Sequence, residues 1–417
     1  MTAYSYDIAV IGAGAAGTMA AIRAGQLNKK VVLIEANDAI GKKILLTGKG
    51  RCNITNTAPM TSFIGKFGKR GEFYRTAFHV FSNEHLIEFL EAGGLKVKTE
   101  RQGRVFPVSD RASSVVDALM GYLVENSVEI LYNMRLQDIA KVNDGFILES
   151  DGGPDIAAKK VILATGGKSY KATGSTGDGF MISERLGHAV TPLKPALVPL
   201  TAKEDWVKGL QGLALENVRV TFECGRRRLL SDIGELMFTH FGVSGPLVLD
   251  LSREALDMSD GKEVLRLFID LKPALNESQL EQRIVKELAA KGNISIKNFM
   301  KDFLPRKLIE PFLDLAGVKH ETKTNQLTQA QRRSMLKLFK ALPMTITGSL
   351  PIEEAMVTGG GVSIKEIDPR TMESRRVKGL YFAGEVIEGA AASGGYNLQQ
   401  AFSTGYLAGQ KAATCAN

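Results

Sequence analysis

The sequence predicts an α/β fold in which a nucleotide-binding part is interrupted by a long insertion. An apolar strand, a glycine-rich turn and a helix of small residues follow one another at the start of the chain, as in a βαβ unit. Two more apolar strands that end in glycine-rich turns lie about 200 residues apart, and the pattern between them changes to short strands and then helices. With 417 residues, 44% hydrophobic and 24% charged, the chain has the composition of a globular protein of two or three domains.

The first element is a βαβ unit built around the sequence GAGAAG, residues 12–17. We expect a strand over residues 7–11 and a helix that ends near Gly25. Gly12 allows the tight turn, Gly14 lets the backbone approach a pyrophosphate, and Gly17 lets the helix pack closely on the strand. The helix N-terminus offers N–H groups and a partial positive charge to the phosphates, so the unit is predicted to bind a nucleotide.

An acidic residue, Glu35, ends the second strand of this unit, which we expect over residues 31–34. Its carboxylate would accept hydrogen bonds from ribose hydroxyls and would disfavour a 2′-phosphate, so the expected nucleotide is FAD or NAD rather than NADP. The residues of this unit that we expect to bind it are Gly12, Gly14, Ala15, Ala16, Gly17, Glu35 and Ala36.

Three later stretches favour FAD over NAD. A strand over residues 160–163 runs into a glycine turn, a strand over 379–382 runs into a glycine and an acid, and a Gly-Gly turn opens a C-terminal helix. A dehydrogenase that binds NAD reversibly needs only the first βαβ unit and a catalytic domain, whereas a long flavin laid across the fold needs more supports. The residues expected to supply them are Ala164, Thr165, Gly166 and Gly167, then Gly384 and Glu385, then Gly394, Gly395, Tyr396, Asn397 and Leu398.

Each of these supports has a physical role. Gly384 permits close backbone approach, and Glu385 would bind ribitol or phosphate-side hydroxyls. The C-terminal helix would direct its first N–H groups at the flavin pyrimidine oxygen, where negative charge develops on reduction. We therefore expect FAD as the cofactor.

The insertion contains two different patterns. Short β segments extend to Leu271, and Pro273 then precedes helical periodicity, with Leu280, Ile284, Val285 and Leu288 on one expected face. The residues Phe299, Phe303, Leu308 and Phe312 form a second expected face. The predicted architecture is a discontinuous Rossmann-like FAD-binding domain (residues 1–192 and 351–417) with an inserted β subdomain (193–272, with a return strand at 343–350) and a small helical cap (273–342).

Seven stretches that span nearly the whole chain occur together: GAGAAG, KKILLTGKGRCNITN, ILATGG, FTHFGVSGP, VTGGGV, GLYFAGE and GGYNLQ. In these motifs and their order the chain resembles the BaiN-type NAD(P)/FAD-dependent oxidoreductases, a family of glutathione-reductase-like flavoproteins that includes aminoacetone-oxidase-like members. The wider class commonly has Asp where Glu385 stands here. The resemblance implies hydride transfer between flavin N5 and a small organic substrate, with reduction of an activated C=C bond by NAD(P)H.

The glycine-punctuated basic loop Gly41–Thr57 follows Glu35, and in flavoproteins of this build such a loop passes along the pyrophosphate and ribitol toward the ring. Gly48 and Gly50 would keep its backbone close to the cofactor. Lys43, Lys49 and Arg51 would supply positive charge, and Asn53 would supply a neutral hydrogen bond. Cys52 has no partner thiol nearby in the sequence, so we assign it to packing or a weak hydrogen bond at the cofactor.

Substrate is expected between the flavin ring and the insertion, because pockets favour domain junctions. His240, in FTHFGVSGP, is a candidate for proton transfer or for orienting a carbonyl, with a structural role as the equal alternative. Tyr396 and Lys49 are the other catalytic candidates: Tyr396 would stack or donate a proton, and Lys49 would stabilise reduced flavin.

Two other functions remain open. One is a flavin amine oxidase that passes electrons to oxygen, and the other is a flavin-containing module that binds RNA or protein through the helical cap, which carries 13 Lys and Arg against 7 Asp and Glu over residues 276–342. The charges of the cap alternate in sign, so the sequence weighs against nucleic acid as a partner. A second GxGxxG unit is absent from the sequence, which leaves NAD(P)H open as a transient electron donor only.

The composition of the chain weighs against disulfides, metal sites and membrane segments. Three widely separated cysteines predict neither disulfides nor a thiolate metal site and fit a reducing cytoplasm. No pair of histidines or carboxylates has ligand spacing, so no metal is expected. No apolar run approaches the roughly 18 residues of a membrane span, and the first residues do not read as a signal peptide. We expect a cytoplasmic protein of open oligomeric state.

Overall fold

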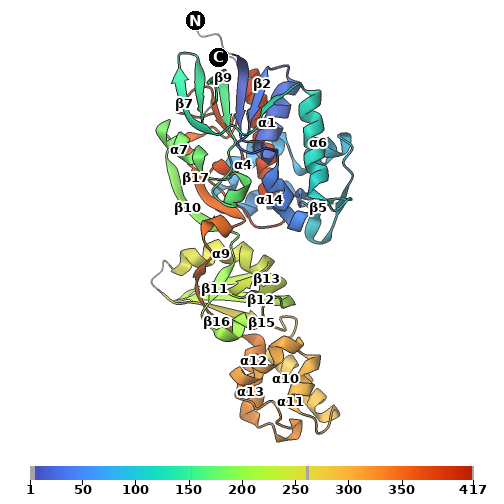
Figure 1. The fold of residues 1–417 in the computed structure, drawn as a ribbon. Coiled ribbons are helices and arrows are strands. Elements are labelled where there is room, and N and C mark those ends of the chain that lie inside the picture. Colours follow the sequence, from blue (N-terminus) through green and yellow to red (C-terminus); the bar gives the residue numbers. More distant parts are fainter. Residues whose placement is uncertain (1–4, 152, 260–262, 416–417) are drawn as a thin grey trace. The chain divides into compact units, whose positions relative to one another are not determined.

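The computed structural model describes residues 5–151, 153–259 and 263–415. The chain forms two compact units, of which unit 1 comprises Met1–Ala196 and Ile352–Asn417 and unit 2 comprises Leu197–Pro351. Each unit has its own apolar core. The predicted α/β fold with an insertion is confirmed, and Figure 1 follows the chain through both units.

Unit 1 is built on a seven-stranded sheet of order β6-β2-β1-β9-β8-β7, in which β18 also pairs with β9. The register sets Ile11 beside Ile34 and Leu163, and Phe382 beside Leu163, so these parallel strands end at one edge of the sheet. The segments that follow them therefore emerge together. The strands are β1 (Tyr6–Ile11), β2 (Val31–Ile34), β6 (Glu129–Leu131), β7 (Leu136–Val142), β8 (Gly145–Ser150), β9 (Ile156–Leu163) and β18 (Leu380–Phe382).

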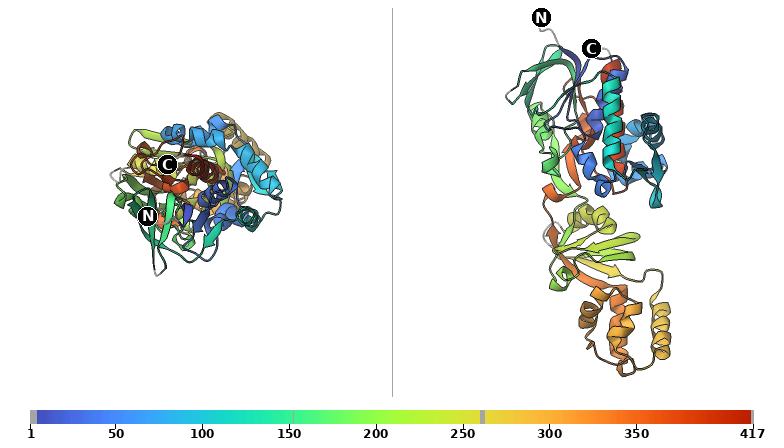
Figure 2. Two further views of the ribbon diagram at one scale, coloured as in Figure 1. Left: turned by 90° about the horizontal axis from the view of Figure 1, so that it is seen from above. Right: turned by 45° about the vertical axis from the view of Figure 1, so that its right-hand side comes forward.

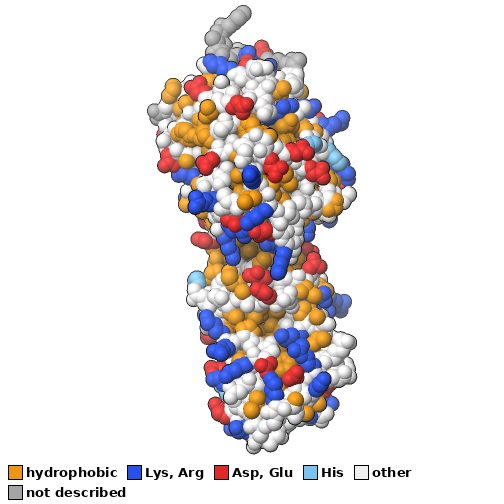
Figure 3. Space-filling model, turned by 90° about the vertical axis from the view of Figure 1, so that its right-hand side faces the viewer, with side chains coloured by type: hydrophobic (Ala, Val, Ile, Leu, Met, Phe, Trp, Pro, Cys, Tyr) orange, Lys and Arg blue, Asp and Glu red, His pale blue; other side chains and the backbone are white. Residues whose placement is uncertain are grey.

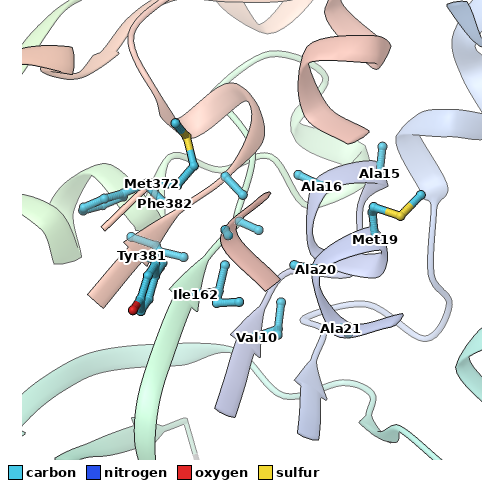
Figure 4. Close-up of a cluster of buried hydrophobic side chains, with 14 of the residues drawn as sticks. Val10, Ala15, Ala16, Met19, Ala20, Ala21, Ile162, Met372, Tyr381 and Phe382 are labelled. Atoms are coloured by element: carbon cyan, nitrogen blue, oxygen red, sulfur yellow. The ribbon is translucent and has the colours of Figure 1, made fainter. Parts of the chain in front are cut away.

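Two helices from opposite ends of the chain, α1 (Ala15–Gln26) and α14 (Tyr396–Thr414), pack against each other and against β1 and β9. A Cβ at Gly405 would lie 2.2 Å from the carbonyl oxygen of Ala16, so only glycine permits this approach. Ala16 and Ala20 of α1 face the sheet core around Val10 and Ile162, and the buried Met19 projects from the other side of the helix, as Figure 4 shows. Close packing of α14 thus depends on the same helix that follows the glycine-rich turn.

Two small antiparallel sheets complete unit 1: β10 with β17, and β3-β5-β4. β10 contains Pro192 and Pro195 and shifts register between Thr191 and Lys194. Because its last residues pair with β17, residues 193–196 belong to unit 1 rather than to the insertion. The elements are β3 (Thr55–Asn56), β4 (Val97–Thr99), β5 (Arg104–Pro107), β10 (Val190–Ala196), β17 (Val357–Val362), α2 (Lys42–Leu46), α3 (Met60–Lys66), α4 (Gly71–Val80), α5 (Asn83–Ala92), α6 (Ala112–Glu125) and α7 (Asp178–Arg185).

The β part of unit 2 is a closed barrel of order β11-β14-β13-β12-β15-β16. Its last strand, at the predicted return segment, pairs with both β11 and β15 and so closes the barrel. Figure 2 shows these strands in two further views. The elements are β11 (Leu200–Ala202), β12 (Ala214–Cys224), β13 (Arg227–Phe238), β14 (Gly242–Ser244), β15 (Leu265–Asp270), β16 (Leu342–Ser349), α8 (Asp205–Lys208) and α9 (Pro246–Ser259).

The helical part of unit 2 consists of α10 (Glu277–Ala290), α11 (Ile296–Phe299), α12 (Arg306–Ala316) and α13 (Gln329–Lys340). The first predicted face is wrong at Val285, which is 45% exposed, because only Leu280 and Ile284 of α10 are buried in the core. The aromatic residues of the second predicted face are buried, although Phe299 ends α11, Phe303 lies in the following turn and Phe312 belongs to α12.

Candidate active site

The glycine-rich turn between β1 and α1 lines a cavity in unit 1 with backbone that carries no side chains at Gly12 and Gly14. Gly12 has φ +95°, and a Cβ there would lie 2.7 Å from the carbonyl oxygen of Ala164. A Cβ at Gly17 would lie 1.8 Å from the carbonyl oxygen of Gly12. At Gly14, which lines the cavity, a Cβ would meet nothing within 4 Å. The open side of the turn, with the first N–H groups of α1 behind it, is suited to an anionic group.

Glu35 is 8% exposed and lines the same cavity. Its Oε2 accepts a hydrogen bond from the Ala13 backbone N–H (2.7 Å), and its Oε1 accepts from the backbone and side-chain nitrogens of Asn37 (2.9 and 2.5 Å). These bonds fix the carboxylate against the glycine-rich turn. A carboxylate has about four acceptor positions, so Glu35 keeps capacity for a ribose hydroxyl.

The cavity has a volume of about 210 Å³ and gathers segments from both ends of the chain. Predicted residues in its lining are Gly12, Gly14, Ala15, Ala16, Glu35, Ala36, Lys43, Ala164, Thr165, Gly166, Glu385, Asn397 and Leu398. As far as the described residues go, the lining does not include Gly17, Gly48, Lys49, Gly50, Arg51, Cys52, Asn53, Gly167, Gly384, Gly394, Gly395 or Tyr396.

The loop Gly41–Thr57 divides into two parts. Gly41, α2 and Thr47 contribute to the cavity lining, after which the backbone turns sharply. Positive φ angles at Gly48 (57°), Lys49 (59°), Gly50 (83°) and Cys52 (61°) make this turn. The second part of the loop then forms β3 and contacts the start of α14 instead of the cavity.

Arg51 and Cys52 lie within this turn and have local partners. The Arg51 guanidinium pairs with Glu100 and Asp110 and lies 4.2 Å from the centre of the Phe106 ring. Its charge is therefore compensated by these two carboxylates beside β5 and not by a group in the cavity. Cys52 is fully buried, and burial raises the pKa of its thiol to about 11 despite a hydrogen bond with Thr47. The thiol is protonated near neutral pH, which agrees with packing rather than nucleophilic chemistry.

Asn53 connects this loop to the start of α14. In the amide orientation that satisfies its neighbours, its nitrogen donates to the carbonyl oxygens of Thr55 and Val105 (3.0 and 3.2 Å), and its oxygen accepts from the Gly395 N–H (3.0 Å). Gly395 has φ +97°, and a Cβ there would lie 2.4 Å from the Thr55 carbonyl oxygen. The loop thus holds the N-terminus of α14 in place.

The first turn of α14 faces the cavity with Asn397, Leu398 and Gln400. Asn397 closes the preceding loop by accepting from the Ala391 N–H (2.9 Å) and donating to the Ala391 carbonyl (3.0 Å). Tyr396 points elsewhere: it is 7% exposed, and its ring packs edge-on against Phe63 with the centroids 4.8 Å apart. The helix contributes its backbone and Asn397 to the site, and Tyr396 contributes to the core.

The Glu385 carboxylate lies next to the segment Ala164–Gly167. A Cβ at Gly167 would be only 2.6 Å from Glu385 Oε1. Its Oε2 accepts from the ammonium of Lys43 at 2.7 Å. Two residues that the sequence did not single out, Ser169 and Thr358, also bond to it. Thr358 lies in the VTGGGV stretch and Ser169 just after the ATGG turn, but a hydroxyl next to glycines does not reveal which carboxylate it will contact.

Arg135 and Asp178 are further lining residues that the sequence did not indicate. They form a two-point ion pair with both nitrogen–oxygen distances at 2.7 Å. Asp178 follows the glycine-rich stretch ATGSTG and opens α7, and this helix start was the one signal that would have pointed to it.

His240 belongs to unit 2, between β13 and β14, and is exposed with its ring edge-on to Phe241 at 4.9 Å. Every lining residue of the cavity belongs to unit 1. A metal-binding cluster of three or more His, Cys, Asp or Glu is absent from the described residues. Within the same residues, no helix combines the length and apolar character that crossing a bilayer requires.

The cavity fits an extended dinucleotide. Its lining includes two helix starts, those of α1 and α14, which both favour anionic groups. Glu35 offers an acceptor for ribose hydroxyls, and Thr165 Oγ1 is buried in the lining without a hydrogen-bond partner among the described residues. A buried hydroxyl without a partner is expected to be satisfied by a ligand or by water.

Comparison with known proteins shows the family to which the chain belongs. The family model described as the HI0933-like protein Rossmann domain matches residues 6–411. The chain belongs to this family. It is 36% identical over 97% of its length to the 3-dehydro-bile acid delta(4,6)-reductase of Clostridium scindens, covering 98% of that protein. It is 31% identical over 97% of its length to the ribosomal RNA dihydrouridine synthase of Escherichia coli, covering 97% of that protein.

The fold agrees with solved structures of flavoproteins. The open conformation of a flavocytochrome c3 fumarate reductase superposes with a TM-score of 0.53 at 17% identity, covering 99% of this chain and 78% of that one. Membership of the HI0933-like family confirms the resemblance, and with it FAD as the cofactor and an FAD-dependent oxidoreductase as the enzyme class. The relatives' names describe reductive enzymes.

Proposed function

We propose that this protein reduces an activated C=C bond of its substrate with hydride taken from NAD(P)H. The observation that carries the proposal is full-length similarity to two enzymes whose names both denote saturation of a C=C bond. Bound FAD supplies a ring that accepts hydride from one molecule and gives it to another. An NAD(P)H-dependent reaction also fits a reducing cytoplasm, with three free cysteines in the described chain.

The chain's own residues would stabilise the charge that this chemistry creates. The first N–H groups of α14, held by Asn397 and by Asn53, present a partial positive charge to the cavity. Lys49 is exposed, with φ +59° between two glycines, a conformation that costs a lysine free energy. Because Lys49 lies outside the cavity lining, its role as the cation that stabilises the reduced ring stays a prediction from the sequence, and we assign Tyr396 to fixing the first turn of α14.

The donor is tested by anaerobic reduction of the purified holoenzyme. Mixed with NADH or NADPH in a stopped-flow instrument, the flavin absorbance should bleach in a single saturable phase, and addition of an enone should restore it. Bleaching by a primary amine such as aminoacetone, with no response to either nicotinamide, would replace the reductase by an amine oxidase.

A substrate within RNA is the second candidate, because one relative at 31% identity is named for ribosomal RNA. Residues 42–111, which include the lining residues Lys42, Lys43, Ile44 and Thr47, hold 13 Lys and Arg against 6 Asp and Glu. In unit 2, α13 has Arg332, Arg333, Lys337 and Lys340 and no acidic residue. On the face drawn in Figure 3 the basic side chains are interspersed with acidic ones, so the charge is spread rather than concentrated.

The two substrate classes differ in salt dependence. Binding of a ribosomal RNA fragment that engages several lysines and arginines should weaken steeply with salt, by roughly 0.7 log unit per phosphate contact for each tenfold increase in salt. For a steroid-like or other small substrate, the logarithm of the binding constant should change with the logarithm of salt concentration by no more than one charge contact would give. Absence of RNA retention at low salt would remove this candidate.

A further inference from the structure

Lys43 and Glu385 are 342 positions apart in the chain and meet at the wall of the cavity. The Lys43 Nζ lies 2.7 Å from Glu385 Oε2, and their side chains are 23% and 19% exposed. Lys43 belongs to α2, and Glu385 follows β18. The pair is partly buried, so loss of either partner leaves the other charge with little solvent to compensate it.

Ser169 and Thr358 complete a closed set of bonds around the pair. The Lys43 ammonium also donates to Ser169 Oγ (2.8 Å), and Ser169 donates to Glu385 Oε1 (3.1 Å). The backbone N–H of Thr358 donates to the same oxygen at 2.7 Å. The carboxylate is thus held on both oxygens by three different segments.

The hydrogen-bonding capacity of Lys43 and Glu385 is not fully used by the bonds within the described chain. An ammonium has three N–H donors and a carboxylate about four acceptor positions. Bonds within the described chain use two donors of Lys43 and three positions of Glu385. One donor and one acceptor remain at the cavity, which is the complement of a hydroxyl group, since a hydroxyl both donates and accepts.

We propose that Lys43 is a positioning residue that neutralises Glu385, so that the pair together binds a hydroxyl of the cofactor's ribitol chain. In this arrangement Lys43 is the counter-ion of Glu385 and not of the cofactor's pyrophosphate. Without Lys43, the Glu385 carboxylate stands uncompensated in a cavity that has to accept the negatively charged pyrophosphate. Bound cofactor also removes water from that carboxylate, so the penalty grows on binding.

The test is FAD affinity of the apoprotein, measured by titration with flavin fluorescence, for Lys43→Met, Glu385→Gln and the double variant. Lys43→Met should weaken FAD binding roughly 30-fold or more, because it leaves a charge without its partner. Adding Glu385→Gln to Lys43→Met should recover affinity, to within roughly tenfold of wild type, because the pair is then replaced by neutral groups. Lys43→Arg, which keeps the charge, should bind more tightly than Lys43→Met.

A double variant that binds FAD as weakly as Lys43→Met, or more weakly, would overturn the proposal, since it would make Lys43 a phosphate ligand. Thermal unfolding of the apoproteins is the second measurement, and the melting temperature should follow the same order. The matched control is the exposed pair Arg75–Glu72, with side chains 50% and 68% exposed, where single and double variants should leave FAD affinity unchanged. The inference rests on FAD alone, so it stands or falls separately from the proposed substrate reaction.

Discussion

Units 1 and 2 bury different kinds of polar residue. The buried polar side chains described in unit 2 are hydroxyls: Thr221, Ser231, Ser244, Ser252 and Thr324. All buried acids, amides and bases of the described chain belong to unit 1: Glu35, Asn56, Asn83, Lys160, His188, Glu388, Gln399 and Gln400. A hydroxyl is satisfied by one or two hydrogen bonds and costs little to bury, whereas charged and amide groups need several partners each.

The difference shows that each unit is stabilised internally in a different way. In unit 1 the buried amides join segments that are distant in sequence, as when Gln399 of α14 accepts from Thr55 Oγ1 (2.6 Å) and donates to the Phe81 carbonyl (3.2 Å). Unit 2 is one continuous segment with a core of Leu, Phe, Ile and Met. Unit 1 therefore depends on exact backbone approach, and unit 2 on apolar burial.

The largest effect should come from a methyl group placed where two backbones meet in unit 1. Gly17→Ala puts a Cβ 1.8 Å from the Gly12 carbonyl oxygen, so the β1–α1 turn has to move. We expect a loss of roughly 3 kcal/mol in the free energy of unfolding, together with loss of bound FAD. Chemical denaturation and the flavin absorbance of the purified protein measure both.

Gly14→Ala is the control three residues earlier. Its Cβ meets nothing within 4 Å, and the backbone there, with φ −78°, accepts alanine. Stability of the apoprotein should change by no more than about 1 kcal/mol, while FAD affinity should fall about tenfold, which is about 1.4 kcal/mol, because the methyl group occupies the side open to phosphate. Equal destabilisation by both variants would contradict the distinction between packing and cofactor approach.

The convergence of the glycine motifs could be predicted from the sequence, because each motif ends a strand. Parallel strands end at one edge, so residues such as Gly12, Ala164 and Glu385 had to emerge together. The barrel of unit 2 was predicted only as short β segments, because strand pairing between distant residues leaves no local pattern.

The direction of single side chains could not be predicted. Glycines and basic residues mark the whole loop Gly41–Thr57, yet the turn after Thr47 takes Arg51 to Glu100 and Asp110, acids from the two loops that flank β5. Tyr396 stands at the helix start as predicted, but Phe63 on α3 provides an aromatic surface that its ring packs against. Both outcomes depend on neighbours that only the folded chain brings together.

A smaller effect is expected from the buried thiol of unit 1 at high pH. The pKa of Cys52 is raised by burial from 9.0 to about 11. In the unfolded chain the thiol ionises first, so the folded state loses stability as pH rises from about 9 toward 11, and it keeps the full contribution below pH 9. Wild type should lose about 1 kcal/mol more than Cys52→Ser between pH 8 and pH 10 in urea denaturation. If the free energy of unfolding of the two proteins changed equally with pH, the pKa of the Cys52 thiol would be the same in the folded and unfolded states, which would contradict its burial.

The smallest effect on stability should come from an exposed residue of unit 2. His240→Ala should change the free energy of unfolding by no more than about 0.5 kcal/mol and should leave the protein yellow, since every cavity residue belongs to unit 1. If His240 transfers a proton to substrate, kcat should nevertheless fall about 10²-fold or more. His320→Ala, at a histidine of the same unit that pairs with Asp314, is the control and should leave kcat unchanged. A colourless His240→Ala protein, or one with wild-type turnover, would remove this histidine from the chemistry and leave unit 2 without an assigned reacting group.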